Sequence, residues 1–269
     1  MSAGRLVVCP TPIGNLEDVT LRVLAALREA DVVACEDTRH TRVLLDRYGV
    51  SARTVSLHEH NERARSAQLV EELRAGATVA LVSDAGTPLV SDPGALLLQA
   101  CIAAGVGVEV LPGPSAALTA VVASGLPAES WRFAGFLPRK KGALRELLAG
   151  ATETLVAFES PRRLAASLAV LAELDAERPV AVCRELTKLH EEVVRGRAGE
   201  LAERYAGEEV RGEVVVVVGA AAEGSAALAG AVDAVRRLVD DGARARTAAS
   251  VVAELTGVSA NELYRALTE

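Results

Sequence analysis

Three short loops rich in glycine and proline carry many of the residues that could bind a ligand. They comprise residues 10–15, 83–88 and 112–115. Each loop follows a short apolar run that predicts a buried strand. Ligands of open α/β sheets bind beyond the carboxyl ends of strands, and Gly and Pro let a backbone pass close to a ligand in a fixed shape. If these strands belong to one sheet, we expect the three loops to converge on one pocket.

Asp84 is the one acidic residue within these loops. Its carboxylate could accept hydrogen bonds from a ribose hydroxyl or from a ligand ammonium group. The alternative is an Asx turn, in which Asp84 caps the Gly86-Thr87-Pro88 turn. The chain contains neither G-x-G-x-x-G nor G-x-x-x-x-G-K-[ST], so a Rossmann dinucleotide site or a P-loop is not expected.

Two carboxylates, Glu36 and Asp37, directly follow the predicted strand Val32–Cys35. A carboxylate within hydrogen-bond reach of a substrate hydroxyl can accept its proton, so these two are the first candidates for a catalytic base. The alternative is that they form ion pairs with Arg39 and Arg42.

Three other side chains have groups that could take part in chemistry: His58, His60 and Glu159. His58 and Glu159 are further candidates for the base. His58 and His60 do not predict a metal site, because no third ligand stands at a recognisable spacing.

Compact basic clusters stand out in an acidic chain. The 29 basic and 36 acidic residues give a net charge of -7, which argues against a generally basic nucleic-acid binder. Any RNA site must therefore be a local patch. Side chains that could contact phosphates, or could simply form a solvated surface, are Arg39, Arg139, Lys140, Lys141, Arg162 and Arg163.

Short apolar runs alternate with amphipathic stretches along the 269 residues, which predicts an α/β fold. We expect two α/β domains, residues 1–116 and 117–220, followed by a linker and a helix-turn-helix-like tail in residues 221–269. Strands are predicted at 6–9, 32–35, 54–57, 79–82, 106–111, 133–136, 154–158, 180–183, 193–196 and 213–219. Helices are predicted near 21–30, 42–48, 63–75, 161–174, 198–205, 246–255 and 260–267, with others opening at Asp92 as N-cap and after Ser115.

Two finer expectations concern the tail. Residues 220–230 have the composition of a flexible linker. The last two helices should share an apolar face but should be too small to hold a core of their own. The residues expected on that face are Leu255, Val258, Leu263 and Leu267.

The four cysteines form no C-x-x-C pair and are expected to be small core residues in a reducing compartment. They are Cys9, Cys35, Cys101 and Cys183. The chain shows no signal peptide and no apolar stretch of membrane-spanning length, so we expect a cytoplasmic protein without a membrane partner.

An ordered set of motifs gives the chain a family resemblance. The motifs are PTPIGNL at 10–16, CEDTR at 35–39, SDAGTP at 83–88, PGPSA at 112–116, FESPRR at 158–163 and CRELTKLHE at 183–191. Together they resemble the ribosomal RNA small subunit methyltransferase I family, which lies within the tetrapyrrole (class III) methylase superfamily. The resemblance covers about residues 4–220.

The resemblance implies S-adenosylmethionine as methyl donor, bound in the cleft between the two domains, and a homodimer. It implies 2'-O-methylation of a cytidine ribose in the decoding region of small-subunit ribosomal RNA, with the RNA or the subunit particle as partner. Carried over by position, the cofactor-binding residues are Pro12, Ile13, Asp84, Gly86, Thr87, Ser115, Ala116 and Phe158.

Two other functions remain open at this point. The first is methylation of a tetrapyrrole or another small molecule on the same fold, because fold does not fix function. The second is a non-catalytic RNA-binding or assembly protein with a vestigial pocket. The basic clusters and the helical tail favour the RNA methyltransferase over the first, and the intact polar loops favour it over the second.

Overall fold

The computed structural model describes residues 4–221 and 225–268. The chain divides into two compact units, of which the first comprises residues 1–119 and 185–191 and the second residues 120–184 and 192–269. Each unit contains one five-stranded sheet, so the predicted α/β fold class is confirmed. Within the described ranges, none of the helices is both long enough and apolar enough to cross a membrane.

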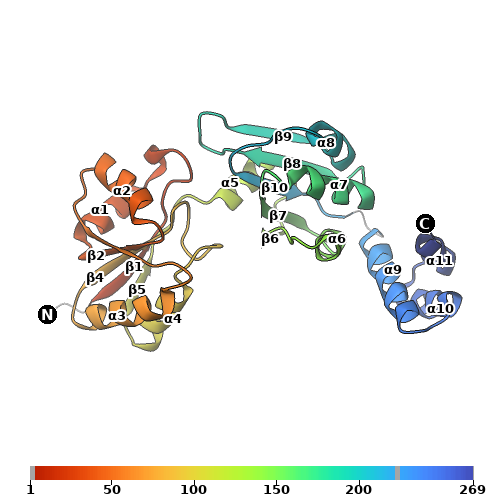
Figure 1. The fold of residues 1–269 in the computed structure, drawn as a ribbon, viewed down its shortest axis with the longest axis horizontal. Coiled ribbons are helices and arrows are strands. Elements are labelled where there is room, and N and C mark those ends of the chain that lie inside the picture. Colours follow the sequence, from red (N-terminus) through yellow and green to blue (C-terminus); the bar gives the residue numbers. More distant parts are fainter. Residues whose placement is uncertain (1–3, 222–224, 269) are drawn as a thin grey trace. The chain divides into compact units, whose positions relative to one another are not determined.

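The sheet of the first unit is entirely parallel, with the strand order β3-β2-β4-β1-β5 (Figure 1). Its strands are β1 (Arg5–Cys9), β2 (Val32–Cys35), β3 (Arg53–Ser56), β4 (Thr78–Val82) and β5 (Gly107–Val110). Its helices are η1 (Leu16–Asp18), α1 (Leu21–Glu29), α2 (Thr38–Arg47), α3 (Glu62–Arg74), α4 (Ala95–Ala103) and the first part of α5 (Ala116–Ser124).

Helices cover both faces of this sheet, which explains why its central strands are continuous apolar runs. Helices α1 and α2 pack on one face with Val7 and Cys9 of β1, and helices α3 and α4 pack on the other with Leu6 and Val8. Successive residues of a strand point to opposite faces, so β1 contributes to both cores.

Helix α4 begins later than the sequence predicted. Its first residue is Ala95 and its N-cap residue is Gly94, so the expectation that Asp92 caps this helix is wrong. The helix start is fixed by Glu62 of α3 instead. The buried Glu62 carboxylate accepts hydrogen bonds from the backbone N–H groups of Gly94 (2.8 Å) and Leu96 (2.9 Å).

The sheet of the second unit is mixed, with the order β6-β7-β10-β8-β9, and only β6 and β7 pair in parallel. Its strands are β6 (Trp131–Phe136), β7 (Thr154–Glu159), β8 (Pro179–Arg184), β9 (Glu192–Arg197) and β10 (Val214–Val218). Helices α6 (Lys141–Ala149), α7 (Leu164–Leu174) and α8 (Ala198–Tyr205) belong to this unit.

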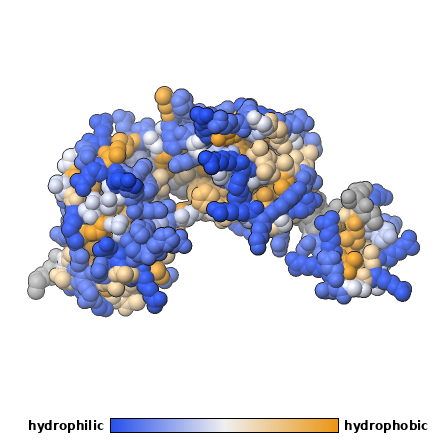
Figure 2. Space-filling model, viewed as in Figure 1, coloured by the Kyte–Doolittle hydropathy of each residue, from blue (hydrophilic) through white to orange (hydrophobic). Residues whose placement is uncertain are grey.

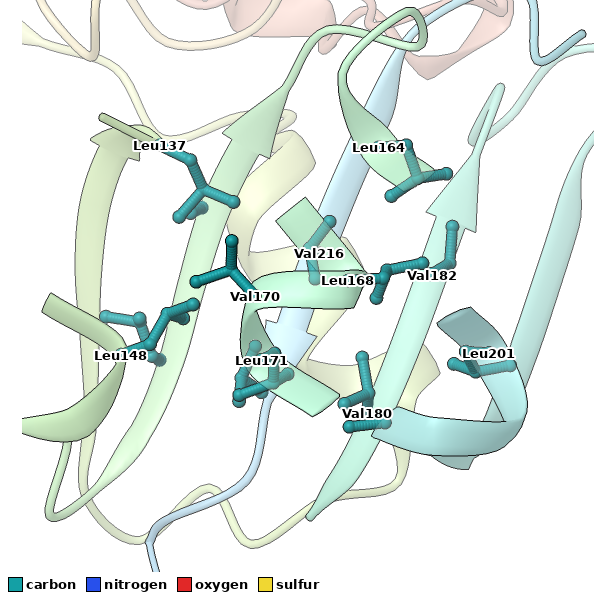
Figure 3. Close-up of a cluster of buried hydrophobic side chains, with 14 of the residues drawn as sticks. Leu137, Leu148, Leu164, Leu168, Val170, Leu171, Val180, Val182, Leu201 and Val216 are labelled. Atoms are coloured by element: carbon teal, nitrogen blue, oxygen red, sulfur yellow. The ribbon is translucent and has the colours of Figure 1, made fainter. Parts of the chain in front are cut away.

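Helices α6, α7 and α8 pack on one face of this sheet. Figure 3 shows Leu148, Leu168 and Leu201, one from each helix, among the buried side chains that meet Val182 and Val216. The five consecutive valines of β10 are all buried between β7 and β8, as their sequence predicted. All four cysteines are free and buried, which confirms their expected place in the cores.

Three helices close the chain: α9 (Ser225–Asp240), α10 (Ala245–Thr256) and α11 (Ala260–Thr268). The linker expected at residues 220–230 is wrong for residues 225–230, which begin α9. Ala231 and Val235 of α9 pack with Ala248 and Ala249 of α10 and with Leu263 of α11. The tail therefore has a small core, contrary to expectation, because α9 supplies a third apolar face.

Leu255 does not join that core, although the other three residues of the predicted apolar face do. It is 81% exposed, and Val251 and Leu238 are also exposed. Figure 2 shows hydrophobic side chains at the surface of the tail between polar ones.

Candidate functional site

The first two glycine- and proline-rich loops are joined by hydrogen bonds beyond the carboxyl ends of β1 and β4. Thr11 and Gly86 form an antiparallel bridge, in which the Thr11 N–H donates to the Gly86 carbonyl (2.8 Å) and the Gly86 N–H donates to the Thr11 carbonyl (3.0 Å). The Thr11 hydroxyl donates to the carbonyl of Ser83 (3.0 Å), and the Ser83 hydroxyl donates to the carbonyl of Gly86 (3.0 Å). These bonds hold the two loops in one fixed arrangement.

The third loop joins this arrangement through Thr87 and Gly113. The Thr87 hydroxyl donates to the carbonyl of Pro114 (3.0 Å). Gly113 lies so close to Pro10 that a Cβ atom on it would stand 2.7 Å from the Pro10 Cβ. The predicted convergence of the three loops is therefore confirmed.

Gly86 allows the loops to approach one another this closely. Its φ of 80° lies in the left-handed region that favours glycine. A Cβ atom on Gly86 would lie 3.3 Å from Cγ2 of Ile13 and 3.7 Å from the carbonyl oxygen of Pro114. A Cβ here would press on Ile13 of the first loop and touch Pro114 of the third, so a larger side chain would have to push the loops apart.

Asp84 connects the second loop to the end of the neighbouring strand β2. Its Oδ1 atom accepts a hydrogen bond from the backbone N–H of Asp37 (3.1 Å). Strands β2 and β4 are paired, so the segments that follow them meet at the same edge of the sheet. The three carboxylates Glu36, Asp37 and Asp84 thus lie in one region of the first unit.

Glu36 and Asp37 have opposite electrostatic environments. Asp37 caps α2, and hydrogen bonds from the Arg39 guanidinium and backbone N–H lower the pKa of its carboxyl to about 2. The ion pair with Arg39 that the sequence offered as an alternative is present at 3.0 Å. Burial and then the Asp84 carboxylate raise the pKa of Glu36. Glu36 is therefore the better proton acceptor of the two near neutral pH.

Asp92 is a further carboxylate that the sequence analysis did not assign to the site. It lies between the second loop and α4, in a segment where Leu89 and Ser91 both have φ values of 71°. Such left-handed conformations are strained for residues other than glycine. Burial, and then the charges of Glu36 and Asp84, raise the pKa of Asp92 to about 6. Strained backbone and raised pKa values are both enriched at functional sites, so we add Asp92 to the candidates.

Asp92→Asn is expected to stabilise the protein at neutral pH but not in acid. Folding raises the pKa of this carboxyl from 3.8 to about 6, so wild-type stability falls as the pH rises between these two values. The uncharged variant should not show this fall in stability. Its free energy of unfolding should exceed that of the wild type by about 1–2 kcal/mol at about pH 7.5 and equal it at about pH 3.5. Urea denaturation at the two pH values measures both quantities. An equal effect at both would contradict a raised pKa.

The remaining candidates for a proton acceptor differ in their surroundings. His58 lies in the first unit with its ring edge-on to that of His60, at a centroid distance of 6.0 Å. Glu159 is buried in the second unit, where it accepts hydrogen bonds from the Ser160 N–H (2.7 Å) and the Ser167 hydroxyl. These partners hold the Glu159 carboxylate in a buried position within the second unit.

Two loops of the second unit carry most of the predicted phosphate contacts. Strands β6 and β7 are parallel, so the loops that follow them lie at one edge of the sheet. The Arg163 guanidinium donates to the carbonyls of Leu137 (3.3 Å) and Pro138 (2.6 Å) and pairs with Glu159 (3.4 Å). Arg163 thus joins the two loops, and we do not include it among the proposed RNA contacts. Exposed basic residues at this edge are Arg139, Lys140, Lys141 and Arg162.

The structure also shows where the motif at residues 183–191 lies. Residues 185–191 connect β8 to β9 but belong to the first unit. A Cβ atom on Gly14 of the first loop would lie 2.8 Å from Oγ1 of Thr187, which itself has a φ of 67°. This segment therefore packs directly on the first of the three converging loops.

Comparison with known proteins shows to which class of protein this chain belongs. The family model described as Tetrapyrrole (Corrin/Porphyrin) Methylases matches residues 5–202. The structure of uroporphyrin-III-C-methyltransferase from Thermus thermophilus is similar, with a TM-score of 0.58 and 28% identity over 80% of this chain and 94% of that one. Its structure complexed with S-adenyl homocysteine has the same fold, with a TM-score of 0.57 and 24% identity over 80% and 97% of the two chains. The family model and the fold therefore place the chain in the class of the tetrapyrrole methylases.

Curated relatives show to which family within this class the chain belongs. Three proteins named ribosomal RNA small subunit methyltransferase I match: 49% identity in Mesorhizobium japonicum, 50% in Mycobacterium bovis and 43% in Escherichia coli O157:H7. These matches cover 98%, 100% and 98% of this chain and 91%, 96% and 94% of the relatives. The chain belongs to the ribosomal RNA small subunit methyltransferase I family, which confirms the resemblance found in its motifs.

Proposed function

We propose that this protein transfers a methyl group from S-adenosylmethionine to the 2'-hydroxyl of a cytidine ribose in the decoding region of small-subunit ribosomal RNA. One observation carries the proposal. Three strand-end loops converge in a chain whose relatives, 43% to 50% identical over nearly its full length, are named ribosomal RNA small subunit methyltransferase I.

The converging loops have the chemistry that an S-adenosyl group requires. Asp84 can accept hydrogen bonds from ribose hydroxyls or from the ammonium group of the donor. The backbone at Gly86 permits close approach, and Ser115 stands directly before α5, where the first N–H groups of a helix have no partner within the helix. The donor contacts that we propose in the first unit are Pro12, Ile13, Asp84, Gly86, Thr87, Ser115 and Ala116. Phe158 belongs to the second unit, and its expected contact with the donor stays a prediction.

The donor supplies a methyl group that its sulfonium charge already activates. The chain must align the ribose oxygen with that methyl group, exclude water and remove the hydroxyl proton. We assign the last task to Glu36, because its raised pKa keeps it closer to the working pH than the ion-paired Asp37.

The basic edge of the second sheet is expected to contact RNA phosphates. Neutralising Arg139, Lys140 and Arg162 together should remove about three ionic contacts and reduce the slope of log affinity against log salt by about 3. Filter binding of small ribosomal subunits over a range of salt concentrations measures that slope. Donor affinity should stay unchanged, since these residues lie outside the converging loops. An unaltered salt slope would leave this edge as ordinary solvated surface.

The three-helix tail is expected to help hold the ribosomal particle. Removing residues 225–269, the whole of α9 to α11, should lower methylation of small subunits about tenfold or more while donor affinity stays unchanged. Cutting before α9 is preferable to cutting within it, because Ala231 and Val235 belong to the tail core. Full activity of the truncated protein would contradict this role, and loss of donor binding would assign the tail a structural one.

We further propose that the protein acts as a homodimer in the cytoplasm, where its substrate is assembled. Several large apolar side chains of the first unit are exposed, as expected for a surface that a second copy covers. They are Leu96, Ile102, Val110 and Leu118, at 45%, 63%, 60% and 53% exposure. Sedimentation at micromolar concentration tests the dimer.

The relation to uroporphyrin-III-C-methyltransferase keeps tetrapyrrole methylation as the alternative. One assay distinguishes RNA methylation from tetrapyrrole methylation. Purified protein and labelled S-adenosylmethionine are incubated with small ribosomal subunits from a deletion strain, and in parallel with uroporphyrinogen III. Label recovered as 2'-O-methylcytidine supports the proposal, whereas label in the tetrapyrrole alone supports the alternative.

A further inference from the structure

The chain contains three phenylalanines, and all three lie together in the second unit. Phe133 and Phe136 belong to β6, and Phe158 belongs to the adjacent strand β7. The ring of Phe158 lies 5.0 Å from that of Phe133 and 5.5 Å from that of Phe136, both in edge-to-face orientation. In a chain with 3% aromatic residues, this cluster is a marked local concentration.

A bulge in β6 places the three rings on the same face of the sheet. Phe133 pairs with Val156 and Phe136 pairs with Phe158, so β6 uses one residue more than β7 over this stretch. In a regular strand, residues 133 and 136 would point to opposite faces. The extra residue returns Phe136 to the face of Phe158, and Gly135 provides the φ of 65° that the bulge adopts.

This face is the one opposite α6, α7 and α8, and its more central residues Val156, Val215 and Val217 are also buried. Leu155 and Ala157 of β7 belong to the core beneath those helices, as does Ala134 of β6 at its margin. Because side chains alternate along a strand, Phe158 and Phe136 must point to the opposite side. The aromatic cluster therefore lies on the other face of the sheet from the core that α6, α7 and α8 cover.

Phe136 is 62% exposed, whereas Phe133 and Phe158 are partly buried. An exposed aromatic ring that is held in place by a second ring is a preorganised stacking surface, since little side-chain entropy is lost when a flat ligand binds to it.

Exposed positive charges flank this ring along the sequence. Arg139 and Lys140 follow Phe136 by three and four residues, and Arg162 follows Phe158 by four. Hydrogen bonds from Arg163 to the carbonyls of residues 137 and 138 hold the two loops together. A protein partner would be expected to cover a broad apolar patch, but the loops beside Phe136 carry cations. A nucleic acid fits this combination, because its bases can stack on the ring and its phosphates can pair with the cations.

We propose that Phe136 is a stacking surface for an unpaired base of the RNA substrate, with Arg139, Lys140 and Arg162 holding the flanking phosphates. Proteins grip unstacked bases of single-stranded RNA on aromatic side chains, and every base offers a flat face for this contact. The inference rests on the proposed function and identifies where the second unit holds the substrate strand.

Phe136→Leu tests the inference, because leucine keeps apolar bulk but removes the aromatic face. The variant should raise the KM for small ribosomal subunits about tenfold, with a smaller change in kcat and an unchanged Kd for S-adenosylmethionine. Phe136→Tyr should restore the KM to near the wild-type value. Leu21→Ala alters another exposed apolar side chain, far from this cluster in the sequence, and should have no effect.

Two results would overturn the inference. An unchanged KM in Phe136→Leu would show that the ring does not contact RNA, and a weakened donor Kd would place it in the donor site instead. Binding of a labelled single-stranded oligoribonucleotide, followed by fluorescence anisotropy, decides the question independently of methyl transfer. If wild-type protein fails to methylate subunits, the proposed function fails, while loss of oligonucleotide binding in Phe136→Leu but not in Phe136→Tyr would still support the stacking surface.

Discussion

Gly86→Val is expected to reduce the affinity for S-adenosylmethionine by about a hundredfold or more. Valine is strained at the φ of 80° that Gly86 adopts, and its Cβ would press on Ile13 and leave no room for its methyl groups beside the carbonyl of Pro114. Separating the loops by even a few tenths of an ångström displaces every backbone group proposed to contact the donor. A hundredfold loss corresponds to about 2.7 kcal/mol, which lies within the range that backbone strain and a lost close contact supply. Isothermal titration calorimetry measures it directly.

Gly105→Val is the matched control for this variant. Gly105 has a similar φ of 69° in the same unit, but no atom lies within 4 Å of the position of its Cβ. Both variants should lose stability through backbone strain, but only Gly86→Val should lose donor affinity. Equal donor affinities in the two variants would show that the converging loops do not form the donor site.

Arg178→Met is expected to destabilise the second unit by about 3 kcal/mol or more. Arg178 is 2% exposed, and its guanidinium donates hydrogen bonds to the carbonyls of Leu148 (2.6 Å), Gly219 (2.8 Å) and Ala151 (2.9 Å). These acceptors lie at the end of α6, just after it and just after β10. Methionine fills much of the volume but removes the guanidinium donor from all three carbonyls, of which that of Ala151 keeps another donor, the Ala221 N–H (2.9 Å).

Urea denaturation followed by the fluorescence of Trp131 reports this loss. Trp131 is the only tryptophan of the chain and lies in β6 of the same unit. Arg197→Met is the control, because Arg197 forms an exposed ion pair with Glu177 and its loss should cost less than about 1 kcal/mol. Similar effects of the two substitutions would show that burial of the Arg178 guanidinium contributes nothing.

The sequence predicted the strands well for a physical reason. Strands buried on both faces, such as β4 and β10, must be uninterrupted apolar runs, and Gly, Pro and Asp mark their ends. The same logic predicted that the loops after β1, β4 and β5 would converge, because parallel strands end at one edge. That prediction rested on the common direction of parallel strands and not on any single residue.

The helices with small residues were harder to recognise. Residues 225–230 are rich in alanine and glycine, so their composition resembles a linker. They become the start of α9 because Ala231 and Val235 further along it pack with α10 and α11. Helix α6 was not predicted either, since its pattern of Leu144 and Leu148 spans only nine residues.

For two side chains, the local sequence does not indicate the surroundings that the structure shows. Asp92 reads as a helix cap in the sequence, and only the contact of Glu62 with the start of α4 removes it from that role. Nothing in the sequence around Arg178 distinguishes it from the other arginines of the chain. Its importance depends on three carbonyls that are distant in the sequence, which no local pattern can show.

Mass spectrometry of small-subunit ribosomal RNA from a deletion strain tests the central claim most directly. The account predicts that one 2'-O-methyl group on a cytidine of the decoding region is lost. Wild-type protein should restore it, whereas Gly86→Val should not at a donor concentration that is limiting for the variant. A methylation map identical to that of the parent strain would contradict the account.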